Sequence, residues 1–181
     1  MNNTLITQDR LDELIRLCGQ TTARRIAEVG VYKGGSLKFL AERFPLSLIV
    51  GFDTFEGLPK EQWSELEIHS PGEFNDTSIE AVKSFVNAPN VKLVKGLFPD
   101  SANEYSNVRF DFVHVDTDFY QSVKACIEWF WPRLNTDGIM VFDDFKWPNC
   151  PGVKKALDES GLKYQPTRAK FQAYVIKDTI E

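Results

Sequence analysis

The sequence lacks the features that mark membrane, secreted or nucleic-acid-binding proteins. It has no apolar run of about 18 residues and no secretory signal pattern, so we expect neither a membrane span nor export. Cysteine is scarce, since Cys18, Cys126 and Cys150 are odd in number and share no metal-ligand spacing; this argues against a disulfide framework and indicates a reducing cytoplasm. The 21 basic residues are outnumbered by 26 acidic ones, and a net charge of −5 argues against non-specific nucleic-acid binding.

What is present suffices for one folded domain. Hydrophobic residues make up 43% of the chain and aromatic residues 13%, which are values typical of globular proteins. A chain of this length can bury roughly 70% of its unfolded surface in one core. The sequence shows neither internal repeats nor low-complexity tracts, so we expect a single domain over residues 1–181.

A glycine-rich junction stands near the amino terminus. An apolar run typical of a buried strand, residues 25–29, leads into EVGVYKGGS at residues 28–36, and an amphipathic helical pattern follows. Gly30 would allow a tight turn or the close approach of a ligand, and Gly34 would open a helix whose free N–H groups favour an electron-rich ligand. The NAD fingerprint GxGxxG is broken, because Tyr32 occupies its second glycine position. Both a cofactor-binding turn and a plain strand-to-helix turn remain open.

Strands and helices alternate along the rest of the chain. The first helix belongs to an N-terminal segment, residues 1–24, and we expect it to cover one face of a sheet. Thr77 has capping-box spacing to Glu80 and should start a later helix. The alternation predicts a mostly parallel α/β sheet with right-handed crossovers, whose ligands bind at the carboxyl ends of the strands. The predicted helices are 7–19, 36–44, 77–87, 120–132 and 152–160, and the predicted strands are 25–29, 47–52, 91–94, 110–115, 138–142, 163–166 and 171–177.

One long stretch has no such periodicity. Residues 54–76 contain glycines, prolines, scattered aromatics and several acids, a composition typical of a functional or mobile loop. We predict that this segment is a lid and that Trp63 reports its closure. His69 in this loop could meet a substrate, although most loop histidines are only solvated.

Two acids follow or end the first strands. Asp53 closes the second predicted strand about twenty residues after the glycine turn, where a carboxylate can accept hydrogen bonds from ribose hydroxyls. The alternative is a turn-forming aspartate. Glu28 either holds a positively charged part of a cofactor or pairs with Lys33 or an arginine, because a buried acid is costly without a partner.

Three further acids are expected to converge. Asp116, Asp143 and Asp144 follow or end two strands that should be neighbours, about 4.8 Å apart. Left unpaired they would repel and take up protons, whereas a hard divalent cation such as Mg²⁺ would keep them ionised. For a single aspartate we would favour a helix-capping role, but for three we favour a metal. His114, inside a strand, is expected to be a satisfied buried polar group.

Together these segments resemble the class I S-adenosylmethionine methyltransferases, and within them the macrocin O-methyltransferase-like group that methylates sugar hydroxyls of natural products. The resemblance covers residues 25–160. It rests on EVGVYKGGS (28–36), GFDTFEGLP (51–59), VKGLF (94–98), HVDTDFY (114–120), FDDF (142–145) and GVKKA (152–156).

The resemblance implies a Rossmann-like, seven-stranded sheet of order 3-2-1-4-5-7-6. It implies that the glycine turn lies beneath the methionine part of the cofactor and that Asp53 binds its ribose. Asp116, Asp143 and Asp144 match the Mg²⁺ ligands of the family. The residues expected around S-adenosylmethionine are Glu28, Gly30, Tyr32, Gly34, Ser36, Asp53, Thr54, Phe55 and Gly96.

We therefore predict a cytoplasmic, Mg²⁺-dependent O-methyltransferase acting on a hydroxyl of a sugar or other small natural product. Related catechol O-methyltransferases use a lysine as base where Phe119 stands here, so Asp116 or Asp118 is expected to collect the proton. The chain is shorter at its N-terminal end than the group, whose extra region often forms subunit contacts, and a homo-oligomer is possible.

Two rival functions remain at this point. One is a haloacid dehalogenase-type phosphatase using Asp116 and Asp118, although Tyr120 stands where that motif has Thr or Val. The other is a non-catalytic cofactor-binding protein.

Overall fold

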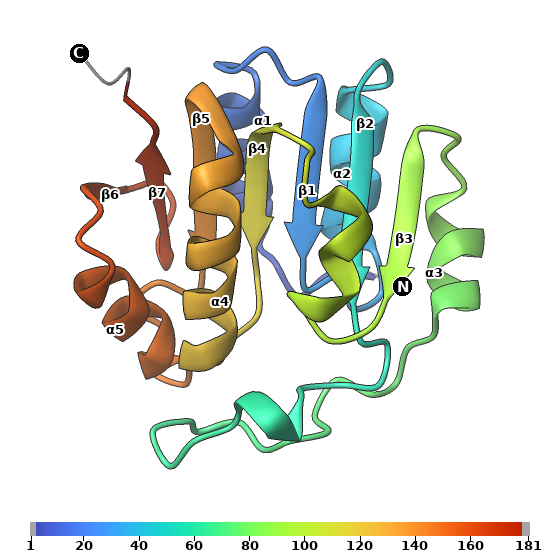
Figure 1. The fold of residues 1–181 in the computed structure, drawn as a ribbon. Coiled ribbons are helices and arrows are strands. Elements are labelled where there is room, and N and C mark those ends of the chain that lie inside the picture. Colours follow the sequence, from blue (N-terminus) through green and yellow to red (C-terminus); the bar gives the residue numbers. More distant parts are fainter. Residues whose placement is uncertain (1–2, 179–181) are drawn as a thin grey trace.

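The computed structural model describes residues 3–178, which form one seven-stranded sheet in the order β3-β2-β1-β4-β5-β7-β6 (Figure 1). The predicted strand order is confirmed. The strands are β1 (Arg25–Val29), β2 (Leu48–Asp53), β3 (Val91–Lys95), β4 (Phe110–Val115), β5 (Leu134–Asp143), β6 (Tyr164–Pro166) and β7 (Gln172–Ile176).

The sheet is mixed, not uniformly parallel. Strands β1 to β5 pair in parallel, whereas β7 runs antiparallel to both β5 and β6. The difference follows from the connections, because β2 to β5 are each reached by a crossover from the preceding strand, while β6 and β7 are joined by the short link 167–171 that reverses the chain. The carboxyl ends of the parallel strands still meet at one edge.

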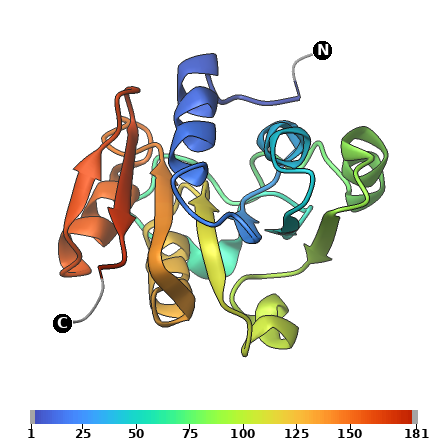
Figure 2. The same ribbon diagram turned by 90° about the horizontal axis from the view of Figure 1, so that it is seen from above.

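Helices cover both faces of the sheet (Figure 2). Helices α1 (Gln8–Cys18), α2 (Gly35–Arg43) and α3 (Ile79–Val86) lie on one face, and α4 (Tyr120–Phe130) and α5 (Pro151–Glu159) lie on the other, with the short helices η1 (Lys60–Gln62), η2 (Asp100–Tyr105) and η3 (Trp131–Arg133) in the connections. Strand β4 shows why two layers are needed: Phe112 joins the core under α1 to α3, and Val113 and Val115 join the core under α4 and α5. Within residues 3–178, every helix falls short of the length and apolarity needed to cross a membrane.

The start of α3 differs by one residue from the prediction. Ser78, not Thr77, is the N-cap, and its Oγ accepts a hydrogen bond from Ala81 N at 3.2 Å. Thr77 Oγ1 instead donates to Tyr32 O at 2.6 Å. The capping-box pattern therefore located the helix but not its cap, because Thr77 is held by the glycine junction.

The buried carboxylate of Asp111 links several segments at the amino-terminal ends of the parallel strands. Asp111 on β4 accepts hydrogen bonds from Thr22 Oγ1 (2.8 Å), Arg24 N (3.0 Å), Arg25 N (2.9 Å) and Asn135 Nδ2 (2.8 Å). Burial alone would raise the pKa of Asp111, but these hydrogen bonds outweigh it and lower the pKa below its usual value. One side chain thus joins the segment entering β1 to β4 and β5.

We predict that Asp111→Ala lowers the free energy of unfolding by about 1 to 3 kcal/mol, because it removes the buried carboxylate that accepts four hydrogen bonds. The exposed Asp12 offers a matched control, since Asp12→Ala should change stability by less than about 0.5 kcal/mol. Because the folded-state pKa of Asp111 is depressed, its contribution is present above the unfolded value of about 4 and is lost as the pH falls through the folded value. Urea unfolding from pH 7 down to pH 3 measures both effects; an equal loss in the two variants at pH 7 would contradict this assignment.

Candidate active site

A cavity of about 570 Å³ lies at the carboxyl ends of the parallel strands. The 54–76 loop crosses this edge of the sheet (Figure 1) and contributes Leu58, Gln62, His69 and Phe74 to the wall. The segment that leads into α1 lines another side of the cavity. The predicted lid and the N-terminal segment therefore both border the site.

The glycine junction is shaped by contacts within the chain. Gly30 has φ +89°, and a Cβ added there would lie 1.8 Å from the backbone oxygen of Asp116. Gly34 has φ +83°, and its added Cβ would lie 2.9 Å from side-chain atoms of Val82 and Val86 on α3. Gly30 is thus required by the close passage of the two strand ends, and Gly34 by the packing of α3 on the start of α2.

Asp53 organises the turn that follows β1. Its Oδ2 accepts hydrogen bonds from Val31 N at 2.7 Å and Tyr32 N at 2.8 Å, and its Oδ1 accepts one from Phe55 N at 2.7 Å. Thr54 Oγ1 donates to Gly57 O at 2.8 Å in the next turn. Asp53 therefore forms a turn, as one of its two interpretations required, and it also lines the cavity.

The predicted cofactor residues divide into two groups. Those that line the cavity are Gly30, Tyr32, Ser36, Asp53, Thr54 and Gly96. Glu28, Gly34 and Phe55 lie outside its wall. Glu28 is fully buried, and its Oε1 lies 2.8 Å from His114 Nδ1, so its partner is a histidine and not the Lys33 or arginine expected from the sequence. Its Oε2 is buried without a hydrogen-bond partner within residues 3–178.

Asp143 is held between two basic side chains. Arg10 Nη1 of α1 donates to Asp143 Oδ1 at 2.6 Å and to Asp144 Oδ1 at 3.0 Å. His114 Nε2 lies 3.4 Å from Asp143 Oδ2. Asp116, Asp143 and His114 offer ligand atoms within 4.8 Å of one another. The three predicted aspartates are thus near each other, but Arg10 already compensates part of their charge.

The charges at this edge are unequal. Burial opposes an imidazolium, but the hydrogen bonds to Asp143 and Glu28 outweigh it and raise the pKa of His114 to about 10. Burial would also raise the pKa of Asp143, yet His114 and Arg10 lower it. Burial and neighbouring carboxylates raise the pKa of Asp116 well above its usual value and that of Asp144 to about 7. Asp143 is therefore ionised and held by two basic side chains, while the negative charges of Asp116 and Asp144 would be only partly compensated.

A sequence model described as a methyltransferase domain matches residues 27–145, which span the glycine junction and all three aspartates. The chain belongs to this methyltransferase family.

Individual relatives agree with the fold. A curated relative from Streptomyces olivaceus, an 8-demethyl-8-(2,3-dimethoxy-alpha-L-rhamnosyl)-tetracenomycin-C 4'-O-methyltransferase, is 24% identical over 82% of this chain and 64% of its own length. This methyltransferase chain thus spans less than two thirds of that relative. The solved O-methyltransferase NovP has a TM-score of 0.83 at 19% identity, covering 98% of this chain and 83% of its own. The calicheamicin methyltransferase CalS11 has a TM-score of 0.74 at 24% identity, covering 92% of this chain and 77% of its own.

The 54–76 loop of this methyltransferase is docked on α4. Glu67 is buried, and its Oε1 accepts a hydrogen bond from Tyr120 N at 2.8 Å, which satisfies a free N–H at the start of α4. Gln62 accepts from Ser122 Oγ at 2.6 Å and donates to Phe98 O at 2.9 Å. The loop therefore completes a helix cap that the sequence around residue 119 does not supply.

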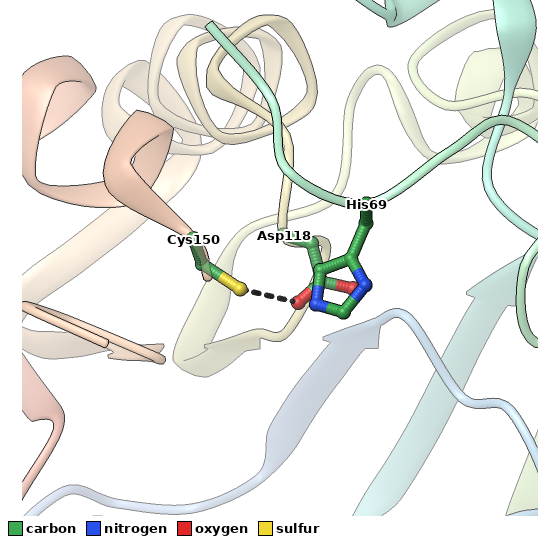
Figure 3. A group of neighbouring side chains, drawn as sticks. All are labelled: His69, Asp118 and Cys150. Carbon is green, nitrogen blue, oxygen red and sulfur yellow. Dashed lines mark hydrogen bonds between the residues drawn. The ribbon is translucent and has the colours of Figure 1, made fainter. Parts of the chain in front are cut away.

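Asp118 lies where the loop meets the body of the protein (Figure 3). Its Oδ1 accepts a hydrogen bond from Cys150 Sγ at 3.2 Å, and His69 approaches from the loop. Burial is the main cause that raises the pKa of Asp118. Both predicted catalytic aspartates, Asp116 and Asp118, line the cavity.

Several site residues were missed in the sequence. Arg10 and Glu67 carried no local signal, because their partners are distant in the chain. Thr117 Oγ1 is buried beside the cavity and has no hydrogen-bond partner within residues 3–178. Trp147 and Phe171 also line the cavity and meet edge to face, with ring centroids 4.5 Å apart. The HVDTDFY motif could have drawn attention to Thr117.

We predict that Glu67→Ala loosens the docked loop, because it removes the carboxylate that caps α4. Hydrogen exchange within residues 60–76 and at the first turn of α4 should become faster. Glu65→Ala is the matched control, since Glu65 is an exposed acid of the same loop. Equal exchange rates in the two variants would contradict the docking role of Glu67.

Proposed function

We propose that this methyltransferase transfers the methyl group of S-adenosylmethionine to a hydroxyl of a small molecule, with the help of a divalent cation such as Mg²⁺. The observation that carries the proposal is the cavity in which the glycine junction, the start of α2 and the aspartates that follow β4 and β5 meet. When bound, S-adenosylmethionine supplies an electrophilic methyl group. The proposed acceptor is a sugar or another small natural product, as it is for the tetracenomycin relative by its name.

The cofactor is proposed to lie at the ends of β1 and β2. Ser36 stands in the first turn of α2 and lines the cavity, and N–H groups of a first helical turn that have no partner within the helix favour an electron-rich ligand. The N–H of Gly35 is already used, since it donates to Asn3 O at 3.1 Å. Asp53 would accept a hydrogen bond from a ribose hydroxyl while it holds the turn. Tyr32 and Gly96 would then flank the nucleoside, whereas Glu28, Gly34 and Phe55 act by supporting the turn.

Ser36→Leu tests this placement. Ser36 is buried in the cavity wall, so the larger side chain should occupy the cofactor's space and weaken S-adenosylhomocysteine binding by about tenfold or more in calorimetry. Ser84→Leu places the same change on an exposed position of α3 and should leave affinity unaltered. If a folded Ser36→Leu protein, checked by thermal unfolding, binds as tightly as the parent, the cofactor lies elsewhere.

The donor set fits a hard divalent cation. Asp116 and Asp144 carry raised pKa values that arise from burial and carboxylate repulsion, and a cation held between them would favour their ionised forms. Asp143 lies behind the cavity wall and is the third proposed ligand, through Oδ2, because its Oδ1 already accepts hydrogen bonds from Arg10 Nη1 and Asp144 N. Such a cation lowers the pKa of a hydroxyl bound to it.

The chain's own residues would then position the acceptor and take its proton. Asp118 is proposed as the proton acceptor, because it lines the cavity and is further from Arg10 than the ion-paired Asp143; Asp116 is the second candidate. Thr117 Oγ1 is available to donate to a ligand oxygen. Trp147 and Phe171 offer apolar faces for a sugar ring, and the docked loop excludes water.

We predict that Asp116→Asn lowers methyl transfer by at least about 100-fold while changing S-adenosylhomocysteine affinity by less than about threefold. The charge is lost but the size is kept, so the cofactor half of the cavity is preserved. Asp100→Asn, at an exposed position of η2, is the matched control. Dialysis against EDTA should reproduce the loss, and Mg²⁺ should restore activity. Methyl transfer that persists in EDTA would exclude the cation while leaving a metal-free methyltransferase.

Neither rival function is favoured. The family match and the strand order support methyl transfer over a phosphatase based on Asp116 and Asp118. The presence of Asp116, Asp118 and Asp144 in the cavity wall gives no support to a purely cofactor-binding role.

A further inference from the structure

Three side chains of different chemistry meet at the boundary between the docked loop and the body of the protein (Figure 3). They are His69 from the loop, Asp118 from the turn after β4, and Cys150 at the start of α5. Each offers a ligand atom, and these atoms lie within 4.8 Å of one another. All three line the cavity. Neither the cofactor nor the aspartate site described above requires a histidine and a thiol here.

His69 is oriented by a second carboxylate. Its Nδ1 lies 2.7 Å from Glu73 Oε2. Backbone and side-chain hydrogen bonds from Ser70 and His69 lower the pKa of Glu73, so Glu73 is ionised and accepts the Nδ1 hydrogen. With Nδ1 facing Glu73, Nε2 is the ring atom that points toward Asp118 (Figure 3). A carboxylate that fixes the tautomer of a histidine in this way is the usual outer partner of a metal-ligating imidazole.

Cys150 is well placed to act as a thiolate ligand once a cation is present. It is 1% exposed and occupies the N-cap position of α5, whose dipole favours a negative charge. Burial and the nearby carboxylates of Asp118 and Asp144 raise the pKa of the thiol, so the free protein keeps it protonated and hydrogen-bonded to Asp118. A cation would reverse that preference.

We propose that His69, Asp118 and Cys150 form a second metal site, selective for a borderline-soft divalent cation of the zinc class. A donor set of imidazole, carboxylate and thiolate suits Zn²⁺ or Co²⁺, whereas Mg²⁺ takes oxygen ligands. In a tetrahedral site such ligand atoms lie about 3.4 to 3.6 Å apart, so the observed separations require only small side-chain movements. Binding breaks the Cys150 S–H bond and releases its proton to solvent. The fourth position faces the cavity.

Such a site would fasten the loop to the body. His69 belongs to the loop, and the other two ligands belong to the elements beneath it, so the metal would slow loop opening. It would also engage Asp118. This last consequence rests on the proposed function: if Asp118 accepts the proton in methyl transfer, Zn²⁺ should inhibit the reaction even with Mg²⁺ in excess.

Cobalt binding tests the site directly and does not depend on activity. Co²⁺ added to the whole protein in saturating Mg²⁺ should give a near-ultraviolet thiolate-to-cobalt charge-transfer band and the strong visible absorption of a tetrahedral ion, which Zn²⁺ should abolish. Cys150→Ser should lose the charge-transfer band. Cys18→Ala removes a buried thiol on the opposite face of the sheet and should retain it. The absence of the band from the parent, or its persistence in Cys150→Ser, would overturn the proposal.

A second variant guards against misfolding. His69→Gln changes a half-buried loop residue, so it should fold, as circular dichroism can verify, and should bind Co²⁺ at least about tenfold more weakly. Zn²⁺ should slow hydrogen exchange within residues 60–76 in the parent but not in His69→Gln. Unchanged cobalt affinity in His69→Gln would overturn the site. Binding without any inhibition would instead uphold the site and contradict Asp118 as the proton acceptor.

Discussion

The carboxylate of Asp143 is the point on which the cavity edge of the sheet depends. It is buried at the end of β5 and contacts Arg10 from α1 and His114 from β4, and His114 in turn contacts Glu28 on β1. These contacts link one helix and three strands, and they leave Glu28 Oε2 without a hydrogen-bond partner within residues 3–178. Removing one partner of such a buried set typically costs about 3 to 5 kcal/mol, because a charge is left uncompensated. The arrangement of the strand ends is thus fixed by charge as well as by packing.

The same network makes the neighbouring acids unequal. Arg10 and His114 keep Asp143 ionised, while Asp116 and Asp144 face the cavity with raised pKa values. The expectation that converging carboxylates leave only a metal to offset their repulsion was therefore incomplete, since Arg10 supplies part of the charge. The negative charge that a cation could still compensate is that of Asp116 and Asp144. A cation at this edge would share Asp143 with Arg10 instead of replacing it.

The fold was largely predictable because its signals are local. Apolar runs located β1 to β4 closely, and the family motifs implied the strand order that was observed. Strand β5 begins at Leu134, four residues before the predicted start. Residues 134–137 are partly polar, so the apolar run that located the strand did not include them. The candidate site was half predictable. Cavity-lining residues that belong to a motif, such as Ser36 and Asp116, were found, whereas partners brought together by folding were not.

Arg10 and Glu67 show why those partners escaped prediction. Arg10 lies on the polar side of an amphipathic helical pattern, where the sequence predicts exposure to solvent. Only the packing of α1 brings it to Asp143 and Asp144, which are more than 130 positions away in the chain. Glu67 lies in a stretch without periodicity. Its role appears only when the loop folds back onto the start of α4. Long-range pairs of charged groups leave no periodic trace in a single sequence.

The docked loop is consequently part of the site's framework. Helix α4 begins directly after the turn that carries Asp118, and Glu67 caps that helix from the loop. If the loop opens, as the lid prediction requires, the first turn of α4 would lose this hydrogen bond, and the backbone next to Asp118 would become freer to move. Entry of an acceptor and placement of Asp118 would then be coupled through one short segment. The cap would form again only when the loop returns, so a closed cavity and a fixed Asp118 would go together.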